Sequence, residues 1–470
     1  MYKTLPIKLY LSLEQESYWR EQCEHSNNLF NCALYEAKQV YFYKLHKDNA
    51  YSTYWRNDEY KTSWKLRKVL GVSYPTLDKM LKNNNHYKAL PAQASQQVLK
   101  SVDYSLKSFN QLVEAFFRGE VDKPLLPSYR KSGGLNAVCF PTTNLKISDG
   151  KVRLSATSEA KKEMLCDTVI DIPSFVIPEQ IKLIRIRPSR GSWWVDFVID
   201  DNKQPIENNQ SLDYENALAI DHGVKFWLSV VSTKKCRSFI VEAPQLKTTL
   251  WKYQAKVKQH KTGKPQKYWD DYLDKLTVKH NLRVRDAVNK AARFLINRCL
   301  KERLGNIVIG WNKGNKLCIN LGRKNNYEIV NMPTARLIKR LEELCPEYGI
   351  RLIVTTEEYT SKASFVDNDS LPEYGAKPKE WKPSGKRISR DVYRTKSGKL
   401  IHADINAACN ILRKVAKQIF SPLREYLTFQ VLKDGAMTDP KRYDIFSNLK
   451  KEYCKQASRS AASTHVVTTV

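Results

Sequence analysis

Four acidic residues stand where the sequence predicts that a buried strand ends or a helix begins. Asp221 closes the apolar segment ALAID, Glu357 and Glu358 follow RLIVTT, and Asp404 opens DINAACNILRKV. Metal-dependent hydrolysis of nucleic acids needs several carboxylates at one point, where they hold two Mg²⁺ ions about 4 Å apart. Because the ends of adjacent strands provide that convergence, Asp221, one of the two glutamates and Asp404 are candidate catalytic residues and metal ligands.

Simpler explanations exist for each residue taken alone. An Asp at a strand end commonly belongs to a turn. Asp404 could cap its helix, because an acidic group there accepts backbone N–H bonds and suits the helix dipole. Neither role explains why Asn406 and Asn410 lie in the first turns of an otherwise apolar helix. His222, directly after Asp221, is either a structural histidine or a group that tunes the metal site.

The composition favours a polyanion as partner. The chain has 470 residues, with 79 Lys and Arg against 49 Asp and Glu, a net charge of +30 and 42% hydrophobic residues. A folded chain of this charge binds nucleic acid by default, and its length allows roughly three domains. The ten cysteines form no Cys-x-x-Cys pair, which is typical of reduced intracellular thiols. With no signal sequence or long apolar segment, we expect a soluble, cytoplasmic protein with no membrane partner.

The first half of the chain combines helices with a β region. A short strand over residues 7–11 precedes mainly helical sequence from about 14 to 118, in which one helix starts near Pro91. From about 124 to 205 the pattern is β, and its last part, 181–200, predicts a half-buried antiparallel hairpin. A polar linker over 202–215 follows.

An aromatic and basic segment lies between the first helices. Tyr54, Trp55, Trp64 and Lys65 belong to it. Such residues suit nucleic acid, because aromatic rings stack on bases while cations neutralise phosphates. The alternative is that these aromatic residues belong to a helical core.

The second half is typical of an α/β unit. Three hairpin-prone strands come first, then basic helices from about 246 to 303, and then strands that alternate with helices. This order matches a ribonuclease H-like arrangement. The strands are predicted over 217–221, 226–232, 238–242, 306–310 and 351–357, and the later helices over 333–344 and 404–417. After about residue 427 the tail turns polar, and we expect its end to be disordered.

An ordered set of motifs gives the chain a family resemblance. It resembles the RuvC-type nuclease half of the TnpB (OrfB) proteins in IDHGVKFWLSVV, NIVIGWNKGNK, TTEEYTSKASFVDNDSLPEY, SGKRISRDVYRTKSG and HADINAACNILRKV. Those proteins are RNA-guided DNA nucleases of insertion sequences, related to compact type V CRISPR effectors. Two upstream segments resemble the family's N-terminal helical region: LPAQASQQVLKSVDYSLKSFNQLVEAFF and KPLLPSYRKSG. The resemblance therefore covers roughly residues 1–417.

The resemblance implies an α+β multidomain fold. Residues 1–13 and 124–205 would form a β-rich wedge-like (WED) domain, into which a helical recognition (REC-like) region, 14–123, is inserted. Residues 206–427 would form a RuvC-like, ribonuclease H-like nuclease domain, and 428–470 a partly disordered C-terminal tail. Within the nuclease domain, 246–303 would be a basic helical insertion and 363–403 a loop insertion.

The resemblance also assigns catalytic and metal-binding roles, with one departure. Asp221 matches the family's first catalytic aspartate and Asp404 its last, but Gly310 stands where many members carry the middle glutamate. A subset carries EE before YTSK instead, and this sequence follows the subset. We prefer Glu357 over Glu358 because it lies two residues before the tyrosine, where the subset most regularly has glutamate. Since strand side chains alternate in direction, only one of the two should face the metals.

A second departure concerns zinc. Many relatives insert a four-cysteine ribbon before the last aspartate, whereas residues 363–403 contain no cysteine, so that zinc is not expected. Asp367 and Asp369 lie in this insertion. They could bind an ion, but solvated loop carboxylates are the simpler interpretation.

Basic residues near these motifs are candidate contacts to a nucleic-acid backbone, with an ordinary solvated face as the alternative. The candidates outside the aromatic and basic segment are Lys362, Lys386, Arg387, Arg390, Lys256, Arg283, Arg285 and Arg130.

Together these features predict an RNA-guided DNA endonuclease. A guide RNA, derived from a transposon or a CRISPR array, would pair with double-stranded target DNA beside a short flanking motif. One RuvC-like site would then cut the DNA with Mg²⁺, for which Mn²⁺ could substitute. The alternative is a nuclease-inactive guided repressor or targeting module. It stays possible because Gly310 replaces the middle glutamate of many family members.

Other functions fit the sequence less well. A single-strand transposase is disfavoured because the sequence has no His-hydrophobic-His pair, and a P-loop motor because it has no Gly-x-x-x-x-Gly-Lys-Ser/Thr motif. An RNA-free resolvase would leave the first 200 residues without a role.

Overall fold

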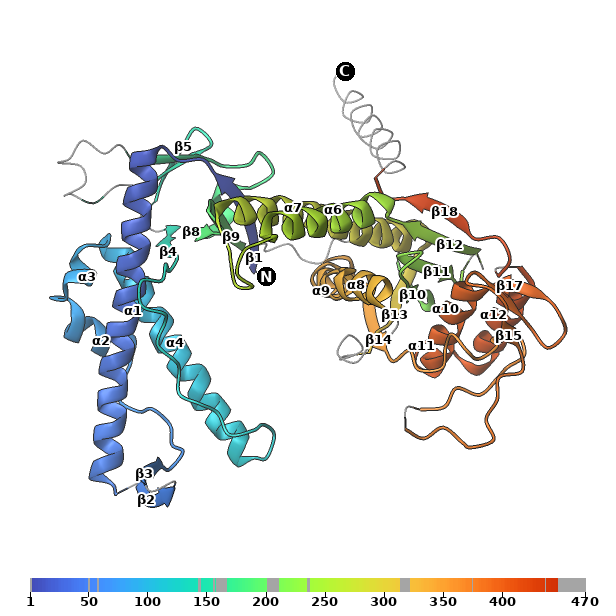
Figure 1. The fold of residues 1–470 in the computed structure, drawn as a ribbon, viewed down its shortest axis with the longest axis horizontal. Helices are drawn as coiled ribbons and strands as arrows, with labels where there is room; N and C mark the ends of the chain where they lie inside the picture. The colour runs from blue at the N-terminus through green and yellow to red at the C-terminus, as the bar shows by residue number, and fades with distance from the viewer. Residues whose placement is uncertain are drawn as a thin grey trace, which may run out of the picture. The chain divides into compact units, whose positions relative to one another are not determined.

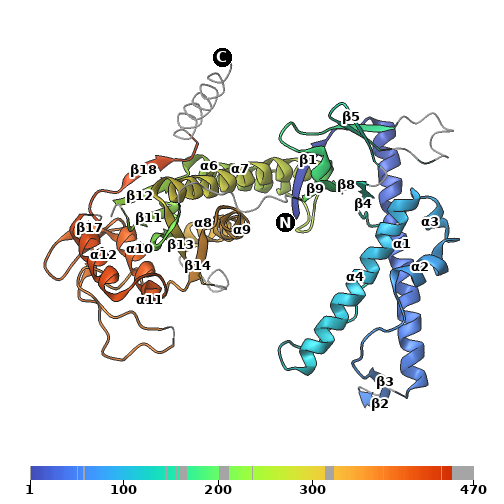
Figure 2. The same ribbon diagram turned by 180° about the vertical axis from the view of Figure 1, so that it is seen from behind.

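The chain divides into two compact units, residues 1–202 and 203–470 (Figure 1; Figure 2 gives the reverse view). In this computed structural model, no helix of the described residues is long and apolar enough to cross a membrane. The structure describes residues 2–49, 51–56, 59–142, 145–154, 157, 167–200, 211–234, 237–312, 322–373, 375–435 and 437–446, with the backbone alone for 51–56, 59–64 and 323–325.

A four-stranded antiparallel sheet organises the first unit. β1 (Tyr2–Leu9) pairs with β9 (Ser192–Asp200), which pairs with β8 (Ile181–Ser189), and β4 (Val138–Pro141) lies on the far side of β8. The first strand of the chain therefore completes a sheet whose other strands come after the helices.

The predicted hairpin over 181–200 forms, and its first strand, β8, is half-buried as predicted, whereas its second strand, β9, is more buried than predicted. β9 is a central strand, and all but its seventh and last residues are buried. Asp196 in β9 is 1% exposed and accepts hydrogen bonds from Nε of Arg185 at 3.1 Å and Nε of Arg187 at 2.7 Å. Since a buried carboxylate requires paired charges, these two arginines belong to the packing of the sheet.

Long helices make up the rest of the first core. α1 (Leu13–Lys47) begins at Ser12, whose side chain forms a capping box with Gln15. α4 (Ala92–Phe117) starts directly after Pro91, as predicted, and buries an apolar stripe of Val98, Val102, Leu106, Phe109 and Val113. Two shorter helices pack beside them, α2 (Tyr74–Leu81) and α3 (Asn85–Lys88), and a 3₁₀ turn covers Pro178–Gln180.

The aromatic and basic segment forms a β-hairpin inside the region that the sequence predicts to be mainly helical. β2 (Tyr51–Arg56) pairs antiparallel with β3 (Glu59–Trp64). Both strands are rich in aromatic residues and each contains one threonine, and these residue types favour strands. The side chains of Tyr54, Trp55 and Trp64 lie outside the described residues. A second small sheet contains β5 (Lys146–Ser148), β6 (Lys151–Leu154) and β7 (Thr168–Asp171).

A six-stranded sheet of order β14-β13-β10-β11-β12-β18 lies at the centre of the second unit. Three antiparallel strands come first, and two strands parallel to β10 follow on its other side. This is the arrangement that the sequence predicts for the second half. The strands are β10 (Asp213–His222), β11 (Leu228–Ser232), β12 (Arg237–Glu242), β13 (Leu304–Gly310), β14 (Arg351–Thr355) and β18 (Lys441–Asp444).

Helices cover both faces of this sheet. Leu218 and Ile220 of β10 face the core that contains α6, α7 and α9, whereas Ala217 and Ala219 face the core that contains α10, α11 and α12. α6 and α7 lie side by side in both views (Figures 1 and 2). The helices are α6 (Pro244–Lys261), α7 (Asp271–Glu302), α8 (Arg323–Asn331), α9 (Thr334–Leu344), α10 (Ala403–Lys414), α11 (Ala416–Ile419) and α12 (Pro422–Gly435), with a 3₁₀ turn over Cys345–Tyr348.

The segment after residue 427 belongs to this unit as far as it is described, which differs from the predicted polar tail. α12 continues to Gly435 and buries Phe429 and Leu432. β18 then adds a sixth strand beside β12, and Ile445 directly after it is 1% exposed. The residues from 447 onward lie outside the described part.

We predict that Ile445→Ala lowers the free energy of unfolding of the second unit by about 3 kcal/mol, because truncating a buried isoleucine leaves a cavity. Val431→Ala is the matched control, because Val431 in α12 is 51% exposed. Thermal unfolding of the full chain measures both. Equal shifts in the two variants would show that the end of the chain adds nothing to the core.

Candidate active site

Side chains of β10 alternate between the two faces of the sheet, and this alternation places Asp221 on the face that α10 covers. Ala217 and Ala219 already lie in the core under α10, and Asp221 continues the same side of the strand. Asp221 sits where β10 ends, opposite Ser229 of β11. The buried strand therefore delivers a carboxylate at the point where its backbone leaves the sheet.

α10 supplies Asp404 in its first turn. The N-cap is His402 and makes no side-chain capping bond, so that capping does not account for Asp404. Instead, Oδ1 of Asp404 accepts a hydrogen bond from Nη2 of Arg387 at 2.8 Å. Arg387 belongs to β15 (Lys386–Arg387), which forms a small sheet with β16 (Val392–Arg394) and β17 (Leu400–His402).

Glu357 lies two residues beyond the end of β14 and folds back over Gly310, the last residue of β13. Its backbone N–H donates to Oδ1 of Asn312 at 3.1 Å, and its carbonyl accepts from Oγ1 of Thr360 at 2.8 Å. A Cβ atom on Gly310 would lie 3.2 Å from Cβ of Glu357 and 2.6 Å from Cδ1 of Ile411. The side chain of Glu357 therefore begins next to residue 310, which is the position where the resemblance expects the middle glutamate.

The two neighbouring glutamates have different surroundings. Oε2 of Glu357 lies 3.4 Å from Nε2 of His222, beside Asp221. Glu358 is bound to Lys414 of α10, with 3.0 Å between Oε2 and Nζ. Burial opposes ionisation of Glu358, but hydrogen bonds with Thr356 and Lys414 outweigh it and lower the pKa of this carboxyl. Only Glu357 shares the surroundings of the two aspartates.

The three carboxylates line one pocket of about 460 Å³ together with His222 and Arg387. Burial raises the pKa of Asp221 well above its usual range, and the negative charges of Asp404 and Glu357 raise it further, while Arg387 opposes them. A cluster of this kind attracts cations, because a cation removes the repulsion between the carboxylates.

The donor chemistry of this pocket fits Mg²⁺, which commonly takes one or two carboxylates and completes its shell with water and substrate phosphates. As the side chains stand, however, no three His, Cys, Asp or Glu residues among those described are grouped closely enough to hold a metal ion. Arg387 draws the carboxylate of Asp404 to itself. The arrangement therefore supplies suitable ligands without a finished coordination shell.

Two buried asparagines of α10 hold the loop that follows Glu357. Nδ2 of Asn410 donates to the carbonyls of Thr360 at 2.9 Å and Ala363 at 2.8 Å. Asn406 donates to the same Ala363 carbonyl at 2.8 Å and accepts from the backbone N–H of Phe365 at 2.9 Å. These bonds explain why polar residues interrupt the apolar helix: they fix the loop after Glu357 to the helix that carries Asp404.

We predict that Asn410→Ala loosens this loop, because the Thr360 carbonyl loses its side-chain donor and the Ala363 carbonyl keeps only that of Asn406, at a cost of about 1–2 kcal/mol. Amide hydrogen exchange of residues 360–365 should accelerate in the full chain. Asn331→Ala is the control, because its side chain also donates to a backbone carbonyl, that of Tyr327 at 2.8 Å, but at the surface. Unchanged exchange at 360–365 in Asn410→Ala would contradict the role given to this asparagine.

Asp367 and Asp369 connect three parts of the loop insertion, and the prediction that they are solvated loop carboxylates is wrong. Oδ2 of Asp369 accepts from the backbone N–H of Ser364 at 2.7 Å and of Ser384 at 3.0 Å. Oδ2 of Asp367 accepts from Oγ of Ser364 at 2.6 Å and from the backbone N–H of Lys396 at 3.0 Å. These bonds lower the pKa of Asp367, although burial opposes them.

We predict that Asp369→Ala opens the insertion, because two backbone N–H groups lose their acceptor at about 1 kcal/mol each. Limited trypsin digestion of the full chain should then cut after Lys386 and Arg387 about tenfold faster. Glu373→Ala in the same insertion is the control, because Glu373 is exposed. Digestion at the wild-type rate would show that Asp369 does not hold the insertion.

The basic residues predicted to contact nucleic acid fall into three groups. Arg387 and Arg390 line the carboxylate pocket. Arg130 instead lies 4.0 Å from the ring centre of Phe30 and binds the side chain of Asn136. Exposed residues of the second unit that do not line that pocket are Lys362, Lys386, Lys256, Arg283 and Arg285, and Lys65 is exposed in the first unit.

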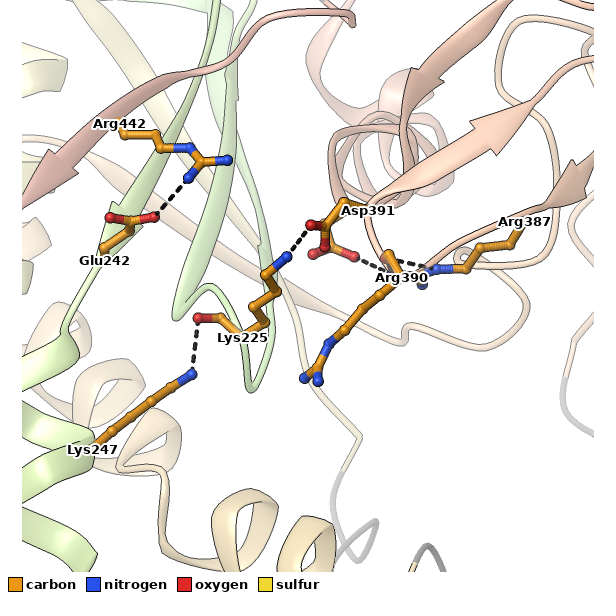
Figure 3. Close-up of polar contacts among 8 residues, drawn as sticks. Lys225, Glu242, Lys247, Arg387, Arg390, Asp391 and Arg442 are labelled. Carbon is orange, nitrogen blue, oxygen red and sulfur yellow. Dashed lines mark hydrogen bonds and ion pairs between the residues drawn. The ribbon is translucent and has the colours of Figure 1, made fainter.

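Two further lysines near the pocket escaped the sequence reasoning. Lys225, in the turn after Asp221, binds Asp391, and Lys247 of α6 donates to the carbonyl of Lys225 at 2.9 Å (Figure 3). Lys225 belongs to the motif IDHGVKFWLSVV, which is the one signal that could have identified it. Lys247 comes near the pocket only through the packing of α6.

Comparison with known proteins identifies one part of this unit. Residues 335–411 match the family model of the Cas12f1-like TNB domain. The matched range contains Glu357, Arg387, Arg390 and Asp404. The match supports the predicted relation to TnpB proteins and compact type V RNA-guided nucleases. No curated protein matches the chain.

Solved structures resemble the chain at low sequence identity. The Cas12f1-sgRNA-target DNA complex matches with 16% identity and a TM-score of 0.43, over 87% of this chain and 98% of that chain. The mini-RNA-guided endonuclease CRISPR-Cas phi3 matches with 9% identity and a TM-score of 0.44, over 90% and 94%. The AacC2c1-sgRNA binary complex matches with 9% identity and a TM-score of 0.35, over 86% and 70%.

Proposed function

We propose that the chain is an RNA-guided DNA endonuclease with a single RuvC-like site. The observation that carries the proposal is the convergence of Asp221, Glu357 and Asp404 on one pocket at the end of the sheet. Two of them lie within the range that matches the Cas12f1-like TNB domain. The net charge of +30 suits a polyanionic partner.

Guide RNA and double-stranded target DNA are the proposed partners. The solved structures that match include complexes with sgRNA and target DNA. Pairing between guide and target would supply the sequence specificity, while the protein would read a short flanking motif. The guide would come from a transposon or from a CRISPR array.

The pocket would act by metal-assisted hydrolysis of a phosphodiester. Asp221, Glu357 and Asp404 would hold Mg²⁺, which when bound activates a water molecule and stabilises charge on the phosphate oxygens. The protein's own contribution is to fix these three carboxylates and to place cations beside them. Arg387 contacts Oδ1 of Asp404, so that this ion pair leaves the second oxygen, Oδ2, for a bound cation.

A guided DNA-binding protein that does not cleave is the second candidate. It is favoured by the same side-chain arrangement, because no three acidic or histidine side chains among the described residues are grouped to hold a metal as they stand. Gly310 also contributes no ligand. The two candidates differ in one measurable property, which is cutting of a guide-matched target.

We predict that Glu357→Gln lowers Mg²⁺-dependent cleavage of a guide-matched duplex by about a hundredfold or more, because it removes a charged ligand. Glu358→Gln should cleave at close to the wild-type rate, because that carboxylate is engaged by Lys414. The protein is purified with the RNA that it binds in cells carrying its own locus, and that RNA is sequenced to define the target.

Asp221→Asn and Asp404→Asn serve as further variants in the same assay and should abolish cleavage while leaving the bound RNA unchanged. A wild-type protein that holds a defined RNA and binds the matching DNA without cutting it would favour the guided binding protein. Loss of activity in Glu358→Gln alone would assign the third ligand to the other glutamate.

A further inference from the structure

Three cations from separate elements meet beside the carboxylate pocket. Lys225 follows β10, Lys247 lies in the first turns of α6, and Arg390 lies in the turn between β15 and β16. Lys247 donates to the carbonyl of Lys225 at 2.9 Å. Lys225 and Arg390 line the same pocket as Asp221 and Asp404. The cluster is therefore an extension of the proposed active site.

Lys225 of this cluster is paired with Asp391, whereas Lys247 is exposed to the positive charges of Arg390 and Lys225. Burial lowers the pKa of Lys247, and the charges of Arg390 and Lys225 lower it further, while Glu328 and Glu242 oppose the shift. Both glutamates have other partners: Oε1 of Glu328 accepts from Nε1 of Trp251 at 3.2 Å, and Oε1 of Glu242 lies 3.6 Å from Nη1 of Arg442. Cations held this close repel one another, and a bound anion would remove that repulsion.

Arg387 and Arg390 differ in what they already bind. The guanidinium of Arg387 donates to Asp404 and to the carbonyl of Arg390. The side chain of Arg390 is exposed and extends away from Asp391, on the side where Lys247 lies (Figure 3). It forms no hydrogen bond or ion pair with any residue that the structure describes. Arg390 is thus available to a ligand, and its planar guanidinium suits a phosphate.

Asp391 sets the position of the cluster. It binds Nζ of Lys225, and its carbonyl accepts from the backbone N–H of Ala403, next to Asp404. The turn that carries Arg390 is therefore connected both to the turn after Asp221 and to the start of α10. These contacts fix the positions of the cations relative to Asp221 and Asp404.

We propose that Arg390, Lys247 and Lys225 form a phosphate subsite, which binds the backbone phosphate next to the one at the carboxylates. This inference rests on the proposed nuclease function. By holding the neighbouring phosphate, the subsite sets which phosphodiester of the strand lies at Asp221, Glu357 and Asp404. The three cations are positioning residues and take no part in breaking the bond.

The subsite can be tested with a neutral methylphosphonate at single positions of the cleaved strand. At the position next to the cleaved bond, it should slow single-turnover cleavage by the guide-loaded wild-type protein about tenfold. Arg390→Ala should slow cleavage of the unmodified strand by a similar factor. Combining the two should add no more than about twofold, because both remove the same contact. Independent, multiplicative effects at both flanking positions would overturn the proposal.

Two control variants make this comparison specific. Lys301→Ala removes an exposed lysine near the end of α7, and its effect should multiply with that of the methylphosphonate. Arg390→Lys keeps the charge and should recover part of the lost rate. A lack of recovery combined with faster proteolysis of the insertion would indicate a merely structural role and would also overturn the subsite.

A binding assay separates failure of the subsite from failure of the nuclease proposal. The affinity of the guide-loaded protein for a short labelled single-stranded DNA is measured against salt concentration without divalent metal. In Arg390→Ala the slope of log affinity against log salt should decrease by about 0.7, the value of one lost phosphate contact. An unchanged slope would overturn the subsite even in an active nuclease. A changed slope in a protein that never cuts would retain the subsite and overturn the nuclease.

Discussion

Repulsion between three carboxylates is the constraint on which the second unit depends. Asp221 is buried at the end of a central strand and faces the charges of Asp404 and Glu357, so that its pKa is raised. Nothing in local folding favours such a group of like charges. The surrounding chain accommodates it by placing Arg387 on Asp404 and His222 next to Glu357. These contacts keep the cluster folded while its oxygens remain at the surface of one pocket.

Holding this cluster requires three segments that are distant in the sequence. β10 fixes Asp221 through its pairing with β11 and β13, and α10 packs across β10 and fixes Asp404. Glu357 lies on irregular backbone, which no ladder of hydrogen bonds holds. Asn406 and Asn410 therefore have a specific purpose, because they bind the following loop to α10. A shift of α10 would consequently move Glu357 together with Asp404.

The sequence predicted those parts of the site that local patterns determine. Asp221 ends an apolar run and Asp404 opens an amphipathic helix, and both features can be recognised within a few residues. The convergence of Lys225 and Lys247 cannot, since it depends on how α6 packs. β18 was also missed, because its segment KRYD has no apolar alternation and becomes a strand only by pairing with β12. The hairpin of β2 and β3 shows the opposite case, in which a residue pattern typical of strands was present and was outweighed by the helices on either side.

The glycine at position 310 and the position of Glu357 are linked by the limited space around the end of β13. β13 brings residue 310 under α10, where any Cβ atom would meet Ile411 at 2.6 Å and the Cβ atom of Glu357 at 3.2 Å. The first contact is with the far end of the Ile411 side chain, so that a side chain at 310 would require Ile411 to repack and Glu357 to shift by a few tenths of an ångström. An acidic residue at the end of β13 would therefore crowd Glu357 in the loop after β14. On this packing, the glycine leaves room for Ile411 and for the loop that carries Glu357, and the absence of an acid at 310 does not by itself indicate an inactive site.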